Sequence, residues 1–326
     1  MTKFLPQASS PSKHGMGWLP DRPDFRDYDE NRIEIREMID AGDESLRRYA
    51  AKKGNRPGEP WPKSFKFPPL SERVTESDLP ASVDLREHCS PIEDQGALGS
   101  CTAQAGVGLI EYYERRAFGR HLDASRLFLY KVTRNLMNLS GDTGAFLRST
   151  IGAMVLFGVP PESYWPYTDD PDTFDREPTA FCYSFAQNFQ TIKYFRHDTP
   201  GAEAATVLKR LKTYLSKGHP AMFGFSVYNS IEQAAEDGRI PFPAERERVE
   251  GGHAIVAVGY DDKMKIKNKF GSAATVGALL IRNSWGTAWG ASGYGWLPYE
   301  YVIRGLAEDF WSVLKKEWVD TGEFGE

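Results

Sequence analysis

Three short segments carry residue types that support nucleophilic chemistry. In the first, Cys101 follows a glycine-rich turn at residues 94–100 and stands at the predicted start of a buried helix. Unpaired amides and the macrodipole make a helix N-terminus positive. We therefore expect the pKa of this thiol to fall well below its ordinary value of about 8.5. A lone cysteine is more often a small residue packed in the core. A reactive thiol at this position therefore requires a nearby base and a residue that orients it.

His253 and Asn283 are candidate partners. His253 leads an apolar segment after two glycines, and imidazole titrates near neutral pH, which suits a general base. Asn283 ends a predicted strand, where it can accept from a ring N–H, and Trp285 can cover that bond from water. Taken singly, these residues also fit a hydrogen-bonded core histidine and an aromatic turn. In the order Cys, His, Asn they favour a nucleophilic site.

The segments around these residues resemble the papain-like cysteine proteases. The matching motifs are Gln95-Gly-x-x-Gly-Ser-Cys101, Gly252-His253-Ala254 and Asn283-Ser-Trp285-Gly-x-x-Trp289-Gly. Residues 79–86 resemble the start of the mature enzyme, and residues 140–144 resemble its substrate-binding glycine segment. Residues 17–27 look like the N-terminal segment of the bacterial, xylellain-like type. The resemblance covers roughly residues 79–310 of the chain.

The resemblance implies a role for each matching residue. Cys101 would attack a peptide carbonyl to form an acyl-enzyme, and His253 would hold the thiolate and protonate the leaving amine. Asn283 would fix the imidazole. Gln95 would donate to the oxyanion, a contact that typically contributes about 10²–10³ in rate. The expected substrate-binding residues are Gly141, Gly144 and Trp285.

The composition of the chain argues against several classes of protein. The chain has 326 residues, a net charge of −5 and 40% hydrophobic residues, which is typical of a globular protein of about two domains. The slight acidity argues against a nucleic-acid partner. Three cysteines without a Cys-x-x-Cys pair give neither a disulfide scaffold nor a thiolate zinc site, and we expect no metal or cofactor. No apolar run suits a signal peptide or membrane span, so we expect a cytoplasmic protein, with non-classical export left open.

The expected elements run from helices to strands. An exposed amphipathic helix is predicted over residues 31–53, followed by a proline-rich connector at 54–69. Periodicity predicts further helices at 100–116, 125–136, 144–157 and 204–216. Short β-branched segments predict strands at 190–195, 221–227, 254–258 and 278–282. Residues 263–269 form a basic run that is interpreted as a solvated hairpin tip, and residues 263–277 as an insertion between the strands that carry His253 and Asn283.

These elements predict an α+β protein. The resemblance implies a helical left domain at residues 79–184 and a β-barrel-like right domain at 185–326, with the active cleft between them. Residues 1–78 are expected to be a pro-like segment that covers the cleft and lowers activity, as in a zymogen, or else a docked structural extension. The predicted function is a cysteine endopeptidase acting on peptides or proteins. A Cys-dependent acyltransferase or amidase and a catalytically silent binding module remain alternatives.

Overall fold

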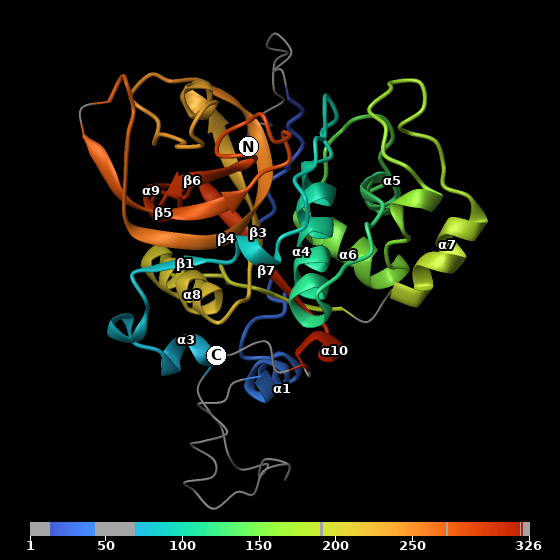
Figure 1. Cartoon of the computed structure of the whole chain (residues 1–326), viewed down its shortest axis with the longest axis horizontal. Helices are drawn as coiled ribbons and strands as arrows, with labels where there is room; N and C mark the ends of the chain where they lie inside the picture. The colour runs from blue at the N-terminus through green and yellow to red at the C-terminus, as the bar shows by residue number, and fades with distance from the viewer. Residues whose placement is uncertain (1–13, 43–68, 190–191, 272, 320, 322–326) are drawn as a thin grey trace, which may run out of the picture.

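The helices of residues 101–186 gather on one side of the molecule, and an antiparallel sheet with further helices packed against it lies on the other (Figure 1). The computed structural model describes residues 14–42, 69–189, 192–271, 273–319 and 321. This arrangement agrees with the predicted α+β architecture of two unlike lobes. The described residues contain no helix long and apolar enough to cross a membrane.

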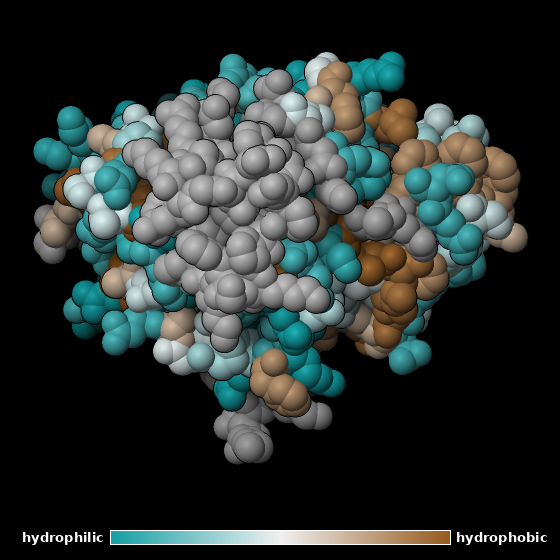
Figure 2. Space-filling view, turned by 90° about the horizontal axis from the view of Figure 1, so that it is seen from below, coloured by the Kyte–Doolittle hydropathy of each residue, from teal (hydrophilic) through white to brown (hydrophobic). Residues whose placement is uncertain are grey.

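The helical lobe is built around one central helix, α4 (Cys101–Phe118), which is buried along most of its length. Its start agrees with the prediction, and it ends at Gly119, whose left-handed backbone lets its N–H bond the carbonyl of Arg115. The other helices of this lobe are α5 (Arg126–Leu136), α6 (Leu147–Phe157) and α7 (Ala180–Ala186). Seen from below, apolar residues are exposed on the right of the molecule, over the helical lobe (Figure 2).

The second lobe is a sheet in which the strand order is β2-β7-β3-β4-β5-β6, with β1 paired to β4. The sheet is an open path and is not closed into the barrel that the resemblance implied. Its strands are β1 (Ser82–Asp84), β2 (Lys193–Arg196), β3 (Ala221–Tyr228), β4 (Val249–Lys267), β5 (Ala274–Arg282), β6 (Tyr294–Pro298) and β7 (Ala307–Leu314).

A hairpin is present here as expected, but most of residues 263–269 are strand rather than its tip, because β4 continues to Lys267. Register pairs such as Lys265 with Val276 and Lys267 with Ala274 join β4 to β5 as a long hairpin. Residues 263, 265 and 267 are exposed whereas Ile266 is buried, as the two-residue period of a strand requires. The lysines therefore lie on the outward face of a strand.

Further helices and 3-10 turns complete the described structure, and one of the helices, α1, lies in the N-terminal part of the chain. They are α1 (Ile33–Gly42), α3 (Leu70–Arg73), α8 (Ala204–Ser216), α9 (Tyr299–Ile303) and α10 (Lys316–Val319), with 3-10 turns η1 (Glu76–Asp78), η2 (Arg86–His88), η3 (Glu162–Tyr164), η4 (Gln187–Phe189) and η5 (Asn229–Ala234). Helix α1 buries Ile35 and Ile39 rather than lying exposed. The rest of the helix predicted to residue 53, and most of the proline-rich connector, lie outside the described residues.

The chain before α1 lies between the two lobes (Figure 1). The N–H of Trp18 donates to the carbonyl of Gly252 in β4 at 3.0 Å, and the carbonyl of Gly17 accepts from Ala145 of the helical lobe at 2.7 Å. The indole of Trp18 is almost fully buried and joins the main hydrophobic core. This N-terminal segment is therefore part of the fold and contacts both lobes.

Candidate active site

Cys101 stands at the first residue of α4 and is fully buried. Ser100 occupies the N-cap position, but its side chain accepts no capping bond, and its Oγ lies 2.7 Å from the Tyr167 hydroxyl. The turn before the helix is held by Asp142, whose Oδ1 accepts the N–H of Gly99 at 2.9 Å. The thiol therefore stands at the start of a buried helix, after a turn that a carboxylate holds in place.

The sheet brings His253 and Asn283 together. His253 lies in β4, Asn283 directly follows β5, and Nε2 of the imidazole lies 2.8 Å from the Asn283 Oδ1. The same oxygen accepts the N–H of Ser284, so Nε2 carries the proton. Trp285 stacks on the imidazole with ring centroids 4.4 Å apart and covers this bond. The sequence predicted both contacts.

The His253 backbone lies beside the nucleophile candidate. The amide of Ala254, the residue after His253, hydrogen-bonds the Cys101 thiol, as do the amides of Gly17 and Thr102. Among the described residues, the Nδ1 atom of His253 has no hydrogen-bond partner although it is buried. The imidazole therefore keeps one nitrogen uncommitted, on the residue before the amide that contacts the thiol.

The predicted fall in the thiol pKa is wrong for this closed arrangement. Burial raises the pKa of Cys101 to about 11, outweighing the three amides that lower it. Burial also lowers the pKa of His253 to about 4, against the Asn283 hydrogen bond that raises it. The sequence argument considered the helix N-terminus but not the removal of the thiol from water. As it lies, the pair is a neutral thiol and a neutral imidazole.

Gln95 is fully buried, and its amide is already engaged. Its Nε2 donates to the carbonyl of Gly15 at 3.0 Å and to the carbonyl of Leu98 at 2.7 Å. Its Oε1 accepts from the Ser284 hydroxyl at 2.6 Å, which fixes the orientation of the amide. A carbonyl of the N-terminal segment therefore lies where the resemblance expects a reacting carbonyl oxygen.

Residues 14–19, here called the N-terminal segment, cross the site from one lobe to the other. At one end the ring of His14 stacks on Trp285 with centroids 4.9 Å apart. At the other end Trp18 and Ala145 form a parallel bridge, and the Trp18 Nε1 donates to Asp309 Oδ2 at 3.2 Å. The Cys101 thiol is buried because the backbone lies directly over it.

Two glycines make this close passage possible. A Cβ atom at Gly17 would lie 1.8 Å from the carbonyl oxygen of Gly99, and one at Gly15 would lie 2.0 Å from that of Leu98. Both obstacles are backbone atoms, which do not swing aside. Only residues without a side chain fit at these two positions.

The two predicted substrate-binding glycines have different surroundings. Gly144 lies against the N-terminal segment, where an added Cβ would be 2.3 Å from the Gly17 carbonyl, whereas Gly141 faces open space. Sequence reasoning missed Ala145, which pairs with the segment through both its N–H and its carbonyl. Alanine carries no motif signal, and only its place one residue after Gly144 pointed to it.

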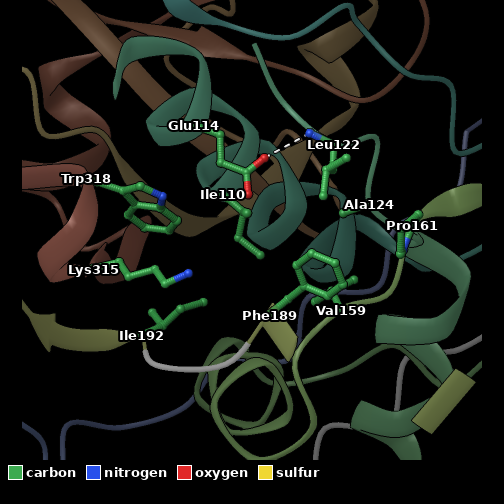
Figure 3. Close-up of a pocket in the computed structure, with 10 residues that line it drawn as sticks. All are labelled: Ile110, Glu114, Leu122, Ala124, Val159, Pro161, Phe189, Ile192, Lys315 and Trp318. Carbon is green, nitrogen blue, oxygen red and sulfur yellow. Dashed lines mark hydrogen bonds between the residues drawn. The ribbon is translucent and has the colours of Figure 1, made fainter. Parts of the chain in front are cut away.

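The pockets described away from this site are lined by neither cysteine nor histidine. The pocket in Figure 3 lies beside the C-terminal half of α4, between Ile110, Phe189 and Trp318. Its free volume of about 20 Å³ holds about one water molecule. Among the described residues, no cluster of His, Cys, Asp or Glu could hold a metal ion. Cys89, Cys101 and Cys182 are all free thiols.

Comparison with known proteins gives a consistent result. The model of the papain family cysteine proteases matches residues 79–308. An uncharacterized peptidase C1-like protein of Acanthamoeba polyphaga mimivirus is 35% identical over 242 residues, covering 72% of this chain and 73% of that protein. The thiol protease aleurain of Arabidopsis thaliana is 28% identical over 69% of this chain, which spans 57% of that relative.

Solved structures agree with these sequence matches. Xylellain, a cysteine protease from Xylella fastidiosa, is 32% identical, with a TM-score of 0.67 over 95% of this chain and 99% of that one. The ragweed pollen protease Amb a 11 in its proform shares the fold at 21% identity, with a TM-score of 0.54 over 82% of this chain and 74% of that one.

Proposed function

This chain belongs to the papain family of cysteine proteases, a cysteine-type peptidase acting on peptides or proteins, and we propose that Cys101 is its nucleophile. His253 acts as general acid and base, and Asn283 orients the imidazole. The observation that carries this proposal is the His253–Asn283 pair, 2.8 Å apart under Trp285, beside a thiol at the start of a helix.

The chemistry follows from these positions. The Cys101 thiolate attacks the peptide carbonyl, forming a carbon–sulfur bond, and the oxyanion accepts from Gln95 Nε2 and the Cys101 N–H. The imidazolium of His253 gives its proton to the amine as the carbon–nitrogen bond breaks. A water molecule, deprotonated by His253, then hydrolyses the thioester and restores the thiol. The hydrogen bond to Asn283 keeps the imidazole aligned through both steps.

A further part of the proposal is that the N-terminal segment holds the enzyme latent. Three contacts support it: the Gly15 carbonyl occupies the Gln95 amide, and the segment bonds Gly252 on one lobe and Ala145 on the other. Burial raises the pKa of Cys101, although the Gly17 amide lowers it, and burial lowers the pKa of His253, so both groups are neutral beneath the segment. Latency then has a steric and an electrostatic component.

The test uses a full-length variant that expels the segment. Gly17→Val places a side chain against the Gly99 carbonyl, so the segment cannot lie over the thiol. We expect its activity on a fluorogenic peptide library to exceed that of the unmodified chain by at least about tenfold. Gly152→Ala, where an added Cβ meets nothing within 4 Å, is the matched control.

Two results would contradict the proposal. Equal activity of the Gly17→Val variant and the unmodified chain would reject latency. Activity that survives Cys101→Ala in the Gly17→Val background would remove Cys101 as the nucleophile. Each result concerns one half of the proposal, so the two halves are judged separately.

A further inference from the structure

The inference starts from a glycine inside the nucleophile helix. Gly108 lies about two turns after Cys101 in α4, and glycine is among the poorest helix formers. An added Cβ at Gly108 would lie 2.7 Å from Nη1 and 3.4 Å from Cζ of Arg282. The space of the missing side chain is therefore occupied by a guanidinium group from the other lobe.

Arg282 links the two halves of the proposed site. It is the last residue of β5, directly before Asn283, and is 4% exposed. Its Nη2 donates to the Ser90 Oγ at 3.0 Å and to the Pro91 carbonyl at 2.7 Å. The side chain thus leaves the sheet beside Asn283 and ends against the helix that carries Cys101.

A buried carboxyl group completes the connection. Glu111, one turn after Gly108, is 3% exposed and accepts the N–H of Ala124 at 3.1 Å. Burial raises the pKa of Glu111, while a hydrogen bond from Ser90 and the charge of Arg282 lower it. A buried arginine near a buried carboxyl group adds little net stability, and the best-attested use of such groups is to fix a unique register.

We propose that Arg282 is a positioning residue for the reaction. Its guanidinium group, seated on Gly108 and bonded to Ser90 and Pro91, sets the separation between α4 and the end of β5. Cys101 lies on the first of these elements, and the second holds Asn283 and through it His253. Because misplacement by about 1 Å can cost about 10²-fold in rate, this contact controls turnover without touching the substrate.

The decisive variant is Gly108→Ala, which displaces the guanidinium group without removing any polar atom. The helix is expected to tolerate the change, because alanine is a better helix former and the atom it meets ends a flexible side chain. Two controls are made in the same helical lobe. Gly152→Ala meets no atom within 4 Å, and Gly106→Ala meets the flexible end of Met154 at 3.0 Å.

All variants are measured in the Gly17→Val full-length background. For Gly108→Ala and Arg282→Met we expect kcat to fall about 10- to 100-fold, with KM within about twofold. The acid limb of the kcat/KM profile should move to higher pH, because a poorly aligned imidazole stabilises the thiolate less. Arg282→Lys, which keeps the charge but loses the fork, should recover part of the loss. The double variant should be no worse than either single one, because both remove one contact.

The inference rests on the proposed function, and the same experiment separates their failures. If the Gly17→Val parent shows no activity that depends on Cys101, the proposed function fails and the inference falls with it. If the parent is active and Gly108→Ala keeps both its kcat and its acid limb, only the positioning role is overturned. A melting temperature within a few degrees of the parent shows that Gly108→Ala is folded, so a loss of kcat is not a loss of structure.

Discussion

Cys101 and His253, the proposed nucleophile and its imidazole partner, are both in their unreactive protonation states where they lie. A thiol with a pKa near 11 and an imidazole with a pKa near 4 are both neutral at pH 7. The thiolate is the reactive form of cysteine, so almost none of Cys101 is reactive under the N-terminal segment. Exposure to water would lower the first pKa and raise the second, because burial is the largest cause of both shifts.

This difference predicts the alkylation behaviour of Cys101. At pH 7 we expect iodoacetamide to modify Cys101 in the Gly17→Val variant at least about tenfold faster than in the unmodified chain. Peptide mass spectrometry measures the modification, and Cys89 and Cys182 are internal controls because both are buried free thiols. Equal rates at Cys101 in the two proteins would mean that the segment does not control the thiol.

Gln95 offers a second prediction about a single residue. In the Gly17→Val background, Gln95→Ala should lower kcat by about 10²–10³-fold with a smaller effect on KM, because an oxyanion donor acts mainly in the transition state. Gln104→Ala is a matched control, since Gln104 is also buried and lies in α4, one turn beyond the thiol. A KM effect without a kcat effect would assign Gln95 to substrate binding instead.

Chemical type was readable from the sequence at these positions, whereas electrostatic environment was not. Cys101, His253 and Asn283 could be identified as candidates from their residue types, their order in the chain and the glycines beside them. The pKa of the thiol is raised by burial, against the lowering effect of the Gly17 amide, and Gly17 is far away in the chain and is brought over Cys101 only by the fold. Ala145 was missed for a related reason, because backbone pairing leaves no mark on side-chain type.

Among the secondary-structure elements, hydrophobic periodicity predicted correctly those helices that bury one face. Helix α8 spans residues 204–216 as predicted, because its apolar residues recur at helical spacing. Strand β4 was predicted as five residues and has 19. Its second half is too polar to look like a strand and persists because it pairs with β5. That pairing is tertiary information, so the periodicity of β4 alone could not supply it.

Helix α6 carries the main electrostatic anchor of the chain that follows the N-terminal segment. Arg148 pairs with Asp21 at 2.5 Å and with Asp27 at 2.8 Å, and it also donates to the Arg22 carbonyl at 2.9 Å. These contacts lie just beyond Trp18, so they hold one end of the segment in place. Arg148 is partly exposed, and salt therefore screens its ion pairs.

Removing this anchor should raise activity. We expect Arg148→Ala in otherwise unmodified protein to increase peptidase activity several-fold, because each lost partly buried ion pair weakens the docked state by a modest amount. Added NaCl should activate the unmodified chain more than the variant. Arg26→Ala is the control, since Arg26 pairs with Asp24 in an exposed contact. Unchanged activity in Arg148→Ala would show that the apolar and backbone contacts alone hold the segment.

In the molecule as a whole, segments that pass from one lobe to pack on the other hold the two lobes together. Strand β1 leaves the helical part of the sequence to pair with β4, and the C-terminal helix α10 packs against α4. Arg282 adds a buried charged contact at the same interface. The two lobes therefore share one core, and Trp18 belongs to that core as well. Such a molecule should unfold as one cooperative unit, which makes its stability a defined quantity.

That stability should fall in acid, because histidines are buried in neutral form. Burial lowers the pKa of His253 to about 4 and of His219 to about 3, and it holds the pKa of His197 well below 6.5. Between pH 6.5 and these values the unfolded chain binds protons that the folded chain does not. The free energy of unfolding therefore decreases as pH falls through this window. Asp309 works in the opposite sense, since burial raises its pKa to about 7.

One substitution isolates the histidine contribution. His219→Gln removes one buried imidazole from the cluster with Tyr113 and Tyr214, so the free energy of unfolding should depend less steeply on pH. Each such histidine contributes about 1.4 kcal/mol per pH unit between pH 6 and 4. Urea unfolding at several pH values measures the slope, with unchanged m-values as the control for two-state behaviour. Identical slopes in the variant and the unmodified chain would mean that His219 is already protonated in the folded protein.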